Sequence, residues 1–251
     1  MYHLVDSADT IKASQFVSKK TKAAPAIIFS LGTRATEIAR SMFPGTPVLA
    51  TMILQKKILE PKSNNTILLV QFPVEIQLQW LQKFLPKVRR VGVLYNPVQN
   101  SDWIREAQKA ARKKNIEIVP FEVSSAKQLK AGLKFISHNA DVLLAIPDQT
   151  VYSGKTAKEV LLFSYRNRIP FVGLSPSWVK AGALYALGID YRNLGRQAAE
   201  LADIILAGKS PGKTPFFHPE KISYSLNTRT MDHLHLQITN DLIKGSAKVF
   251  E

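Results

Sequence analysis

Short β-rich runs that alternate with helix-sized intervals are the feature that most constrains the fold of this chain. Such alternation is typical of parallel sheets covered by helices, because strands that run parallel are joined by a crossover that a helix usually supplies. The predicted strands are 26–31, 47–52, 66–70, 90–95, 117–123, 141–146, 169–174, 183–189 and 222–226, with a weaker one at 2–5. With 251 residues, the chain can form two units of roughly 100 to 120 residues each.

Helix signals occupy the intervals between these runs. The predicted N-caps are Thr33, Ser101, Ser125 and Ser175, the last followed by a proline at the first helical position. Ser125 is followed three residues later by Gln128, which is the spacing of a capping box. An amphipathic helix is predicted over 194–207 and closed by Gly208, since glycine accepts the left-handed conformation of a C-terminal cap.

The formal net charge of +15 raises the question of a nucleic-acid partner. The basic residues form only short clusters, and no aromatic side chains are interleaved with them as base stacking would require. Solvated helix faces account for these charges, so no nucleic-acid partner is expected. The absence of cysteine excludes disulfides, thiolate metal sites and a thiol nucleophile.

No apolar run approaches the ~18 residues that a membrane helix needs. The longest uncharged stretch, 41–55, is interrupted by Pro44, Gly45 and Pro47. The opening residues do not combine a basic start with an apolar block, so no signal peptide is expected in this sequence.

Two apparent catalytic motifs fail on inspection. Residues 153–156 read SGKT, but a phosphate loop would need glycine where Gln149 stands. Residues 173–177 imitate a nucleophile elbow around Ser175, yet Ser177 replaces the second glycine and Pro176 removes a backbone donor. A helix cap is the better interpretation of Ser175, and no enzyme activity is expected. A small α/β hydrolase remains the less favoured alternative.

His233 and His235 would share one face of a strand and suggest a two-histidine metal site. No third ligand accompanies them, so a solvated or edge-strand pair is the better interpretation. Neither a metal nor a cofactor is expected.

Binding residues are predicted from position. In open parallel sheets, ligands bind beyond the carboxyl ends of the strands, where helix N-termini present free N–H groups. The loops at those ends contain small hydroxyls, amides and one carboxylate, a set that suits a small zwitterion: N–H and hydroxyl groups for its carboxylate, Asp148 for its ammonium. Helix capping by Thr33, Asn100 and Ser101, and a turn role for Asp148, remain compatible alternatives. The candidate ligand-binding residues are Gly32, Thr33, Asn96, Asn100, Ser101, Asp148, Gln149, Thr150 and Ser175.

Three segments resemble a known family. They are VGVLYNPVQNS (91–101), AIPDQTV (145–151) and ALGIDYRNLGRQAAELADIILAGKSPGKTP (186–215). They are similar to the substrate-binding proteins of ABC importers of the tryptophan/tyrosine type. The resemblance implies two Rossmann-like lobes of the type I periplasmic-binding architecture, with the chain crossing between them near Pro86, near Asp190 and near 212–216. The implied lobes are 1–87 with 191–213, and 88–190 with 214–251.

The resemblance also implies a set of ligand contacts, and this chain differs from the family at several of the positions concerned. Ligand contacts carried over from the family are Gly32 and Thr33 in the first lobe and Asn100, Ser101, Asp148 and Gln149 in the second. The family usually has Asp-Asn at 148–149, Ser-Glu at 98–99 and an Asp-Pro loop at 54–56, where this chain differs. Relatives carry a signal, a strand and a helix ahead of the position of Met1, so an N-terminal strand and helix are expected to be missing.

The function implied by the resemblance is that of a solute-binding component of an ABC importer, which binds a small polar ligand, amino-acid-like and possibly aromatic, by hinge closure. Its expected partners are that small molecule and an ABC permease, and its expected location is periplasmic or lipid-anchored. A sensory or regulatory binding module that is not coupled to transport is the alternative that sequence does not separate from it.

Overall fold

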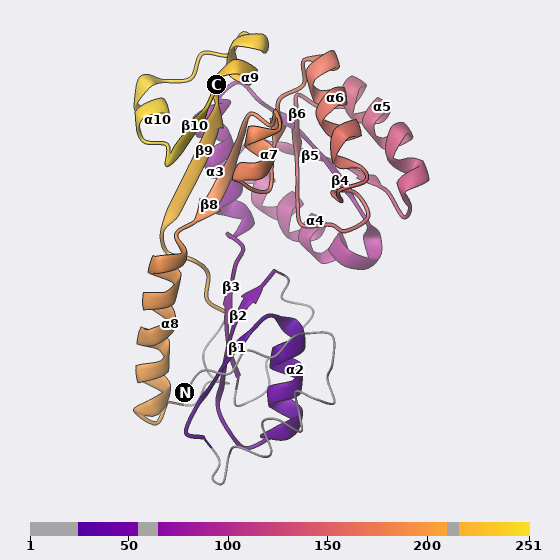
Figure 1. Ribbon diagram of the computed structural model, residues 1–251. Coiled ribbons are helices and arrows are strands. Elements are labelled where there is room, and N and C mark those ends of the chain that lie inside the picture. Colours follow the sequence, from indigo (N-terminus) through magenta and orange to yellow (C-terminus); the bar gives the residue numbers. More distant parts are fainter. Residues whose placement is uncertain (1–24, 55–64, 210–215) are drawn as a thin grey trace. The chain divides into compact units, whose positions relative to one another are not determined.

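The computed structural model describes residues 25–54, 65–209 and 216–251, and in it the chain forms two compact units (Figure 1). Unit 1 consists of the described residues up to Phe72 together with Asp190–Lys221, and unit 2 consists of Pro73–Ile189 and Ile222–Glu251. The chain therefore passes from one unit to the other after Phe72, after Ile189 and after Lys221.

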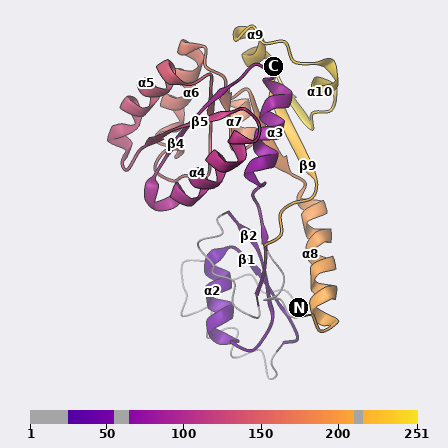
Figure 2. The same ribbon diagram turned by 180° about the vertical axis from the view of Figure 1, so that it is seen from behind.

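Unit 1 is built on a three-stranded parallel sheet in the order β1-β2-β3. Its elements are β1 (Ile28–Leu31), α2 (Thr33–Met42), β2 (Val48–Ile53), β3 (Asn65–Leu69) and α8 (Tyr191–Leu206). Helices α2 and α8 flank this sheet on opposite sides in both views (Figures 1 and 2). Phe217 extends the sheet by one parallel bridge to Leu68. A small apolar core of Ala50, Ile53, Ile67 and Leu69 lies between these layers.

Unit 2 is built on a seven-stranded sheet in the order β10-β9-β8-β7-β6-β4-β5. All its neighbouring strands are parallel except β8 and β9. The strands are β4 (Arg90–Tyr95), β5 (Glu117–Glu122), β6 (Val142–Leu144), β7 (Phe171–Val172), β8 (Tyr185–Ile189), β9 (Ile222–Asn227) and β10 (Lys248–Phe250). The helices are α3 (Val74–Phe84), α4 (Pro97–Arg112), a 3-10 turn η2 (Ala126–Gln128), α5 (Leu129–Asn139), α6 (Ala157–Asn167), α7 (Pro176–Lys180), α9 (Thr228–His233) and α10 (Asn240–Lys244).

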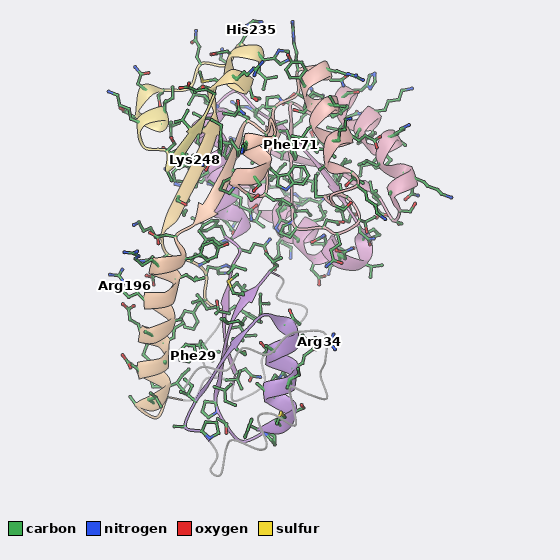
Figure 3. All side chains as sticks on the ribbon, in the orientation of Figure 1. Phe29, Arg34, Phe171, Arg196, His235 and Lys248 are labelled. Atoms are coloured by element: carbon green, nitrogen blue, oxygen red, sulfur yellow. The ribbon has the colours of Figure 1, made fainter. Side chains whose placement is uncertain are left out.

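The central strands of unit 2 are apolar on both faces because helices cover both. Val91, Val93 and Leu94 of β4 are fully buried, which is the pattern of a parallel strand between two helical layers. Aromatic rings fill the other end of the sheet, where Phe84 stacks on Tyr185 with ring centroids 4.0 Å apart. Phe171, labelled in Figure 3, lies in the interior of this unit, whereas Arg196 projects from α8 of unit 1.

The predicted lobes differ from these units at two crossings. Helix α3 was expected in the first lobe, but Leu78, Leu81 and Phe84 pack into the core of unit 2, so the chain enters unit 2 before this helix rather than near Pro86. The last crossing follows Lys221 rather than 212–216. The crossing near Asp190 agrees with the prediction. The weak strand at 2–5 lies outside the described residues.

Several predicted helix starts are displaced. Gly32, not Thr33, is the N-cap of α2, and Asn96, not Ser101, is the N-cap of α4. Helix α8 begins at Tyr191, three residues before the predicted start, because the carboxylate of Asp190 accepts a hydrogen bond from the Asn193 N–H. The capping box of Ser125 and Gln128 is confirmed, although it opens η2, which leads into α5.

Candidate functional site

The loops that follow β4 and β6 form a polar cluster that is joined by side-chain hydrogen bonds. Strands β4 and β6 are parallel neighbours, with Val91 opposite Val142, so their carboxyl ends lie at one edge of the sheet. The loop after β4 runs directly into α4, and the loop after β6 runs through 147–151. These two segments, 96–101 and 147–151, are called the rim loops below. Five of the predicted ligand-binding residues are joined there by hydrogen bonds: Asn96, Asn100, Asp148, Gln149 and Thr150.

Asp148 is the centre of the rim loops. Its side chain is buried, and its Oδ2 accepts hydrogen bonds from the Asn96 N–H at 2.6 Å and from Asn100 Nδ2 at 2.8 Å. Its Oδ1 accepts from the N–H groups of Thr150 at 2.9 Å and Val151 at 3.0 Å. A carboxylate offers about four lone-pair sites, and all are used. The predicted turn role of Asp148 is therefore present, while the predicted salt bridge to a ligand ammonium has no free acceptor.

Asn96 seals the start of α4. Its Oδ1 accepts a hydrogen bond from the Val98 N–H at 3.0 Å, and its carbonyl accepts from the N–H groups of Gln99 and Asn100. Because Pro97 has no N–H, the first turn of α4 keeps no free backbone donor. The helix end predicted to bind a ligand carboxylate in this unit is thus already occupied by its own capping residue.

Thr150 and Gln149 present the polar groups that remain. The Thr150 hydroxyl oxygen accepts from Asn96 Nδ2 at 2.9 Å and from Gln99 Nε2 at 3.3 Å, which leaves its own O–H free to donate. Gln149 is exposed, and its backbone N–H donates to Gln99 Oε1 at 3.2 Å. Gln99, which was not among the predicted ligand-binding residues, links both rim loops through these two hydrogen bonds.

Ser101 and Ser175 are not part of this cluster. The Ser101 hydroxyl donates to the Pro97 carbonyl at 2.6 Å within the first turns of α4. Ser175 is the N-cap of α7 by backbone position, but its hydroxyl makes no capping hydrogen bond, contrary to the predicted cap. Within the described ranges, no histidine or carboxylate is hydrogen-bonded to Ser175, so the hydrolase alternative has no general base beside its nucleophile.

A cluster of aromatic side chains packs next to the rim loops. Tyr152, directly after them, lies 6.2 Å from Phe171 and 6.1 Å from Trp178, measured between ring centroids. Burial raises the pKa of the Tyr152 hydroxyl, and the negative charge of Asp148 raises it further. The hydroxyl therefore stays neutral, and this packing holds the rim loops on a rigid apolar layer.

In unit 1, the start of α2 differs from the start of α4. Its N-cap is Gly32, which has no side chain to accept a hydrogen bond and adopts φ 87°, in the left-handed region that favours glycine. Among the described residues, the N–H groups of Thr33 and Ala35 have no acceptor. The Gly32 carbonyl accepts a hydrogen bond from Thr36 Oγ1 at 2.8 Å, and the Gly32 N–H donates to the Thr51 carbonyl at 2.8 Å. An open helix N-terminus of this kind attracts anions.

Met52 is a residue that sequence reasoning missed. It lies next to that helix start, at an irregularity of β2 where the register shifts between Thr51 and Ile53, and it adopts φ 60°. Its side chain is 43% exposed. A positive φ at methionine could not be predicted from the sequence, because methionine rarely adopts that conformation.

The histidine pair does not form the predicted strand face. His233 ends α9, where its ring stacks on Tyr165 and its Nε2 contacts the Tyr165 carbonyl at 2.9 Å. His235 lies in the loop that follows, with φ 54°. In the parts of the chain that the structure describes, no three His, Cys, Asp or Glu side chains are grouped so as to hold a metal ion. The same residues contain no helix long and apolar enough to cross a membrane.

Comparison with known proteins gives concordant results. Residues 5–250 match the family described as ABC transporter substrate binding protein. A tyrosine-binding protein of Clostridioides difficile (strain R20291) is 27% identical over 242 residues, which is 92% of this chain and 68% of that protein.

Solved structures show the same architecture. The ligand-free, open structure of a substrate binding protein with adhesive properties from Clostridium difficile has a TM-score of 0.74 at 23% identity, and the match covers 96% of this chain and 82% of that one. An ABC domain in complex with L-Trp from Streptococcus pneumonia has a TM-score of 0.65 at 19% identity, covering 96% and 86%. At these identities the likeness establishes the predicted α/β periplasmic-binding fold. Because the family match runs over nearly the whole sequence, the chain belongs to the ABC transporter substrate binding protein family.

Proposed function

We propose that the protein is the solute-binding component of an ABC importer and that its ligand is an amino acid with an aromatic side chain. The observation that carries this proposal is the open N-terminus of α2, where Gly32 leaves the N–H groups of Thr33 and Ala35 without acceptors. Two free N–H groups and the positive end of a helix suit the carboxylate that every amino acid carries.

The relatives support the aromatic class of ligand. One relative is a tyrosine-binding protein, and one solved structure of the same fold holds L-Trp. In this chain, exposed apolar side chains stand at the carboxyl ends of strands in each unit, namely Leu31, Met52 and Val98. Such side chains give an aromatic ring apolar surface to cover.

The contribution of unit 2 comes from the donors that its own hydrogen bonds leave free. We assign ligand contacts to the Thr150 hydroxyl, the Gln149 side chain and the Ser175 hydroxyl, while Asp148, Asn96 and Asn100 position the rim loops. The side chains of Ser101 and Asn100 already donate hydrogen bonds within unit 2, so they are not assigned to the ligand. The ligand ammonium, which only donates, is then met by Gln149 Oε1 and the Ser175 hydroxyl oxygen rather than by the Asp148 carboxylate, while the Thr150 O–H donates to a ligand oxygen.

In this proposal, transport depends on a closed form of the protein that the ligand stabilises. When both units contact one ligand, only the closed arrangement makes the full set of contacts, so the ligand shifts the balance between open and closed forms by that difference in affinity. A permease that recognises the closed form completes the importer. A role outside the cytoplasm, periplasmic or lipid-anchored, is part of the same proposal.

The test is isothermal titration with L-tyrosine, L-tryptophan, L-alanine and tyramine, which is tyrosine without its carboxylate. We expect one of the two aromatic amino acids to bind, L-alanine to bind at least tenfold more weakly, and tyramine not to bind. Equal binding of tyrosine and tyramine would contradict the role of the α2 start, and failure of both aromatic amino acids would contradict the ligand class.

A matched pair of glycines separates binding from backbone strain. Gly32 and Gly208 both have φ 87°, and a Cβ added to either would meet nothing within 4 Å. Gly32→Ala, at ψ 162° in a region essentially confined to glycine, should lose about 1–3 kcal/mol of unfolding free energy, and Gly208→Ala should lose about 1 kcal/mol. Only Gly32→Ala should lower the affinity for the amino acid, by tenfold or more, because it alters the helix start to which the ligand carboxylate is assigned.

A further inference from the structure

A groove between α5 and α6 is a second candidate site, and none of its lining residues belongs to the rim loops. The two helices lie next to each other in unit 2 in both views (Figures 1 and 2), and the groove along them has a volume of about 700 Å³. Its lining residues are Lys130, Leu133, Lys134, Ser137, His138, Lys155, Lys158, Glu159, Leu162, Phe163, Arg166 and Asn167.

Cations line both walls of this groove. On α5, Lys130 and Lys134 are four residues apart, so they lie about 6 Å from each other on one face, and the His138 ring continues the same row. The other wall carries Lys155, Lys158 and Arg166. Helix α5 contains no carboxylate, and Glu159 is the single acidic residue among those that line the groove.

These cations are not neutralised by their neighbours. Across ranges 25–54, 65–209 and 216–251, none of the four lysines nor Arg166 forms an ion pair. On other helices, Arg105 pairs with Asp102 and Arg196 pairs with Glu200, so unpaired cations are not universal on the charged helix faces. A row of unpaired charges of one sign on both sides of a groove produces a positive local potential that attracts anions.

The groove combines this charge with apolar side chains. Leu162 is 40% exposed between the cations of α6, and Leu133 and Phe163 lie deeper, packed with the core of unit 2. Lysine and arginine stems cover apolar surface while their charged ends reach outward, which is how basic helices meet the boundary between lipid headgroups and acyl chains. Phe163 packs with the core, so its phenyl ring is not presented for stacking on nucleic-acid bases.

We propose that the α5–α6 groove is a docking surface for a lipid bilayer with anionic, phosphate-bearing headgroups. Charge complementarity favours this occupant because four or more clustered lysines and arginines are the composition of anionic-lipid surfaces on proteins. Glu159 offsets one of the five charges. The proposal does not rest on the identity of the amino-acid ligand.

Co-sedimentation with vesicles tests this surface. Vesicles of phosphatidylglycerol and phosphatidylcholine in a one-to-two ratio are compared with vesicles of phosphatidylcholine alone, at low and at physiological salt. The groove variant carries Lys130→Gln, Lys134→Gln and Lys158→Gln. The control variant carries Lys87→Gln, Lys109→Gln and Lys113→Gln, which are exposed lysines of the same unit outside the groove, so both variants lose the same net charge.

The expected result is binding of the unmodified protein to the anionic vesicles only, weakened by salt. Each removed charge should cost about fivefold in the partition coefficient, so the groove variant should lose on the order of 100-fold and the control much less. Circular dichroism and the melting temperature verify that both variants fold.

Two outcomes would overturn the proposal: no binding of the unmodified protein, or equal losses in the two variants, which would indicate net charge alone. A third would replace it. If the groove variant loses binding to inorganic polyphosphate while the unmodified protein ignores the anionic vesicles, the groove takes a soluble polyanion instead.

Discussion

At the scale of single residues, Asp148 shows how a buried carboxylate can join two loops that are distant in sequence. Its four N–H donors come from two segments about 50 residues apart in sequence, so the charge is compensated by the chain itself. Buried carboxylates of this kind are tolerated only when all their acceptor sites are used. Asp148 therefore fixes the distance between the rim loops.

We predict that Asp148→Ala lowers the free energy of unfolding by about 3 kcal/mol, because it leaves several buried donors without an acceptor. Urea denaturation measures this loss. Asp102→Ala is the control, since Asp102 is exposed and pairs only with Arg105, and it should change stability by less than about 0.5 kcal/mol. Equal losses in the two variants would contradict the tethering role of Asp148.

At the scale of helices and strands, the sequence predicted most elements and few of their ends. Apolar runs such as 90–95 and 117–123 correspond closely to β4 and β5, because a strand covered on both faces must be apolar at nearly every position. Helix starts were shifted where the capping residue was glycine or lay before a proline, as at Gly32 and Asn96.

The candidate site was predictable in position but not in chemistry. The rule that ligands bind at the carboxyl ends of parallel strands locates both rim loops and the start of α2. It does not reveal that Asn96 closes one helix start while Gly32 leaves the other open, because that depends on which donors face each side chain after folding. The assignment of α3 to unit 2 likewise depends on packing partners that are distant in sequence.

Close packing between β4 and α5 gives an element-scale prediction. A Cβ added to Gly92 would lie 2.9 Å from the Ala140 Cβ and 2.7 Å from Ile136 Cδ1, so Gly92→Ala should cost about 1–3 kcal/mol of unfolding free energy. Gly195 lies inside α8 with open space around it, and Gly195→Ala should stabilise by about 0.5–1 kcal/mol through helix propensity. Urea denaturation of both variants should show opposite signs, and a stable Gly92→Ala variant would refute the packing.

At the scale of the whole molecule, three segments of the chain join the two units. Asp190 and Lys221 are the residues of unit 1 at two of these crossings, and Lys221 Nζ donates to Asp190 Oδ2 at 2.9 Å. The hydrogen bond from the Asn193 N–H, followed by that from Lys221, lowers the pKa of Asp190 below its ordinary value of 3.8.

The lowered pKa predicts a pH dependence with a definite sign. Ionised Asp190 stabilises the fold above the pKa of the unfolded chain, and this contribution is lost as the pH falls through the lower pKa of the folded protein. Asp190→Asn should therefore melt at a lower temperature than the unmodified protein at neutral pH, and the difference should shrink as the solution is acidified below 3.8. Asp203→Asn, on the exposed side of α8, is the control and should show no such convergence in thermal scans.

The antiparallel ladder of β8 and β9 ends with Ile189 opposite Ile222. Ile189 is the last residue of unit 2 before the chain leaves it, and Ile222 is the first residue after the chain returns. Two of the three connections thus start from one pair of facing residues. Since the sequence has no cysteine, a double replacement Ile189→Cys and Ile222→Cys would place one unambiguous crosslink between these two connections, at a spacing that paired strands already supply.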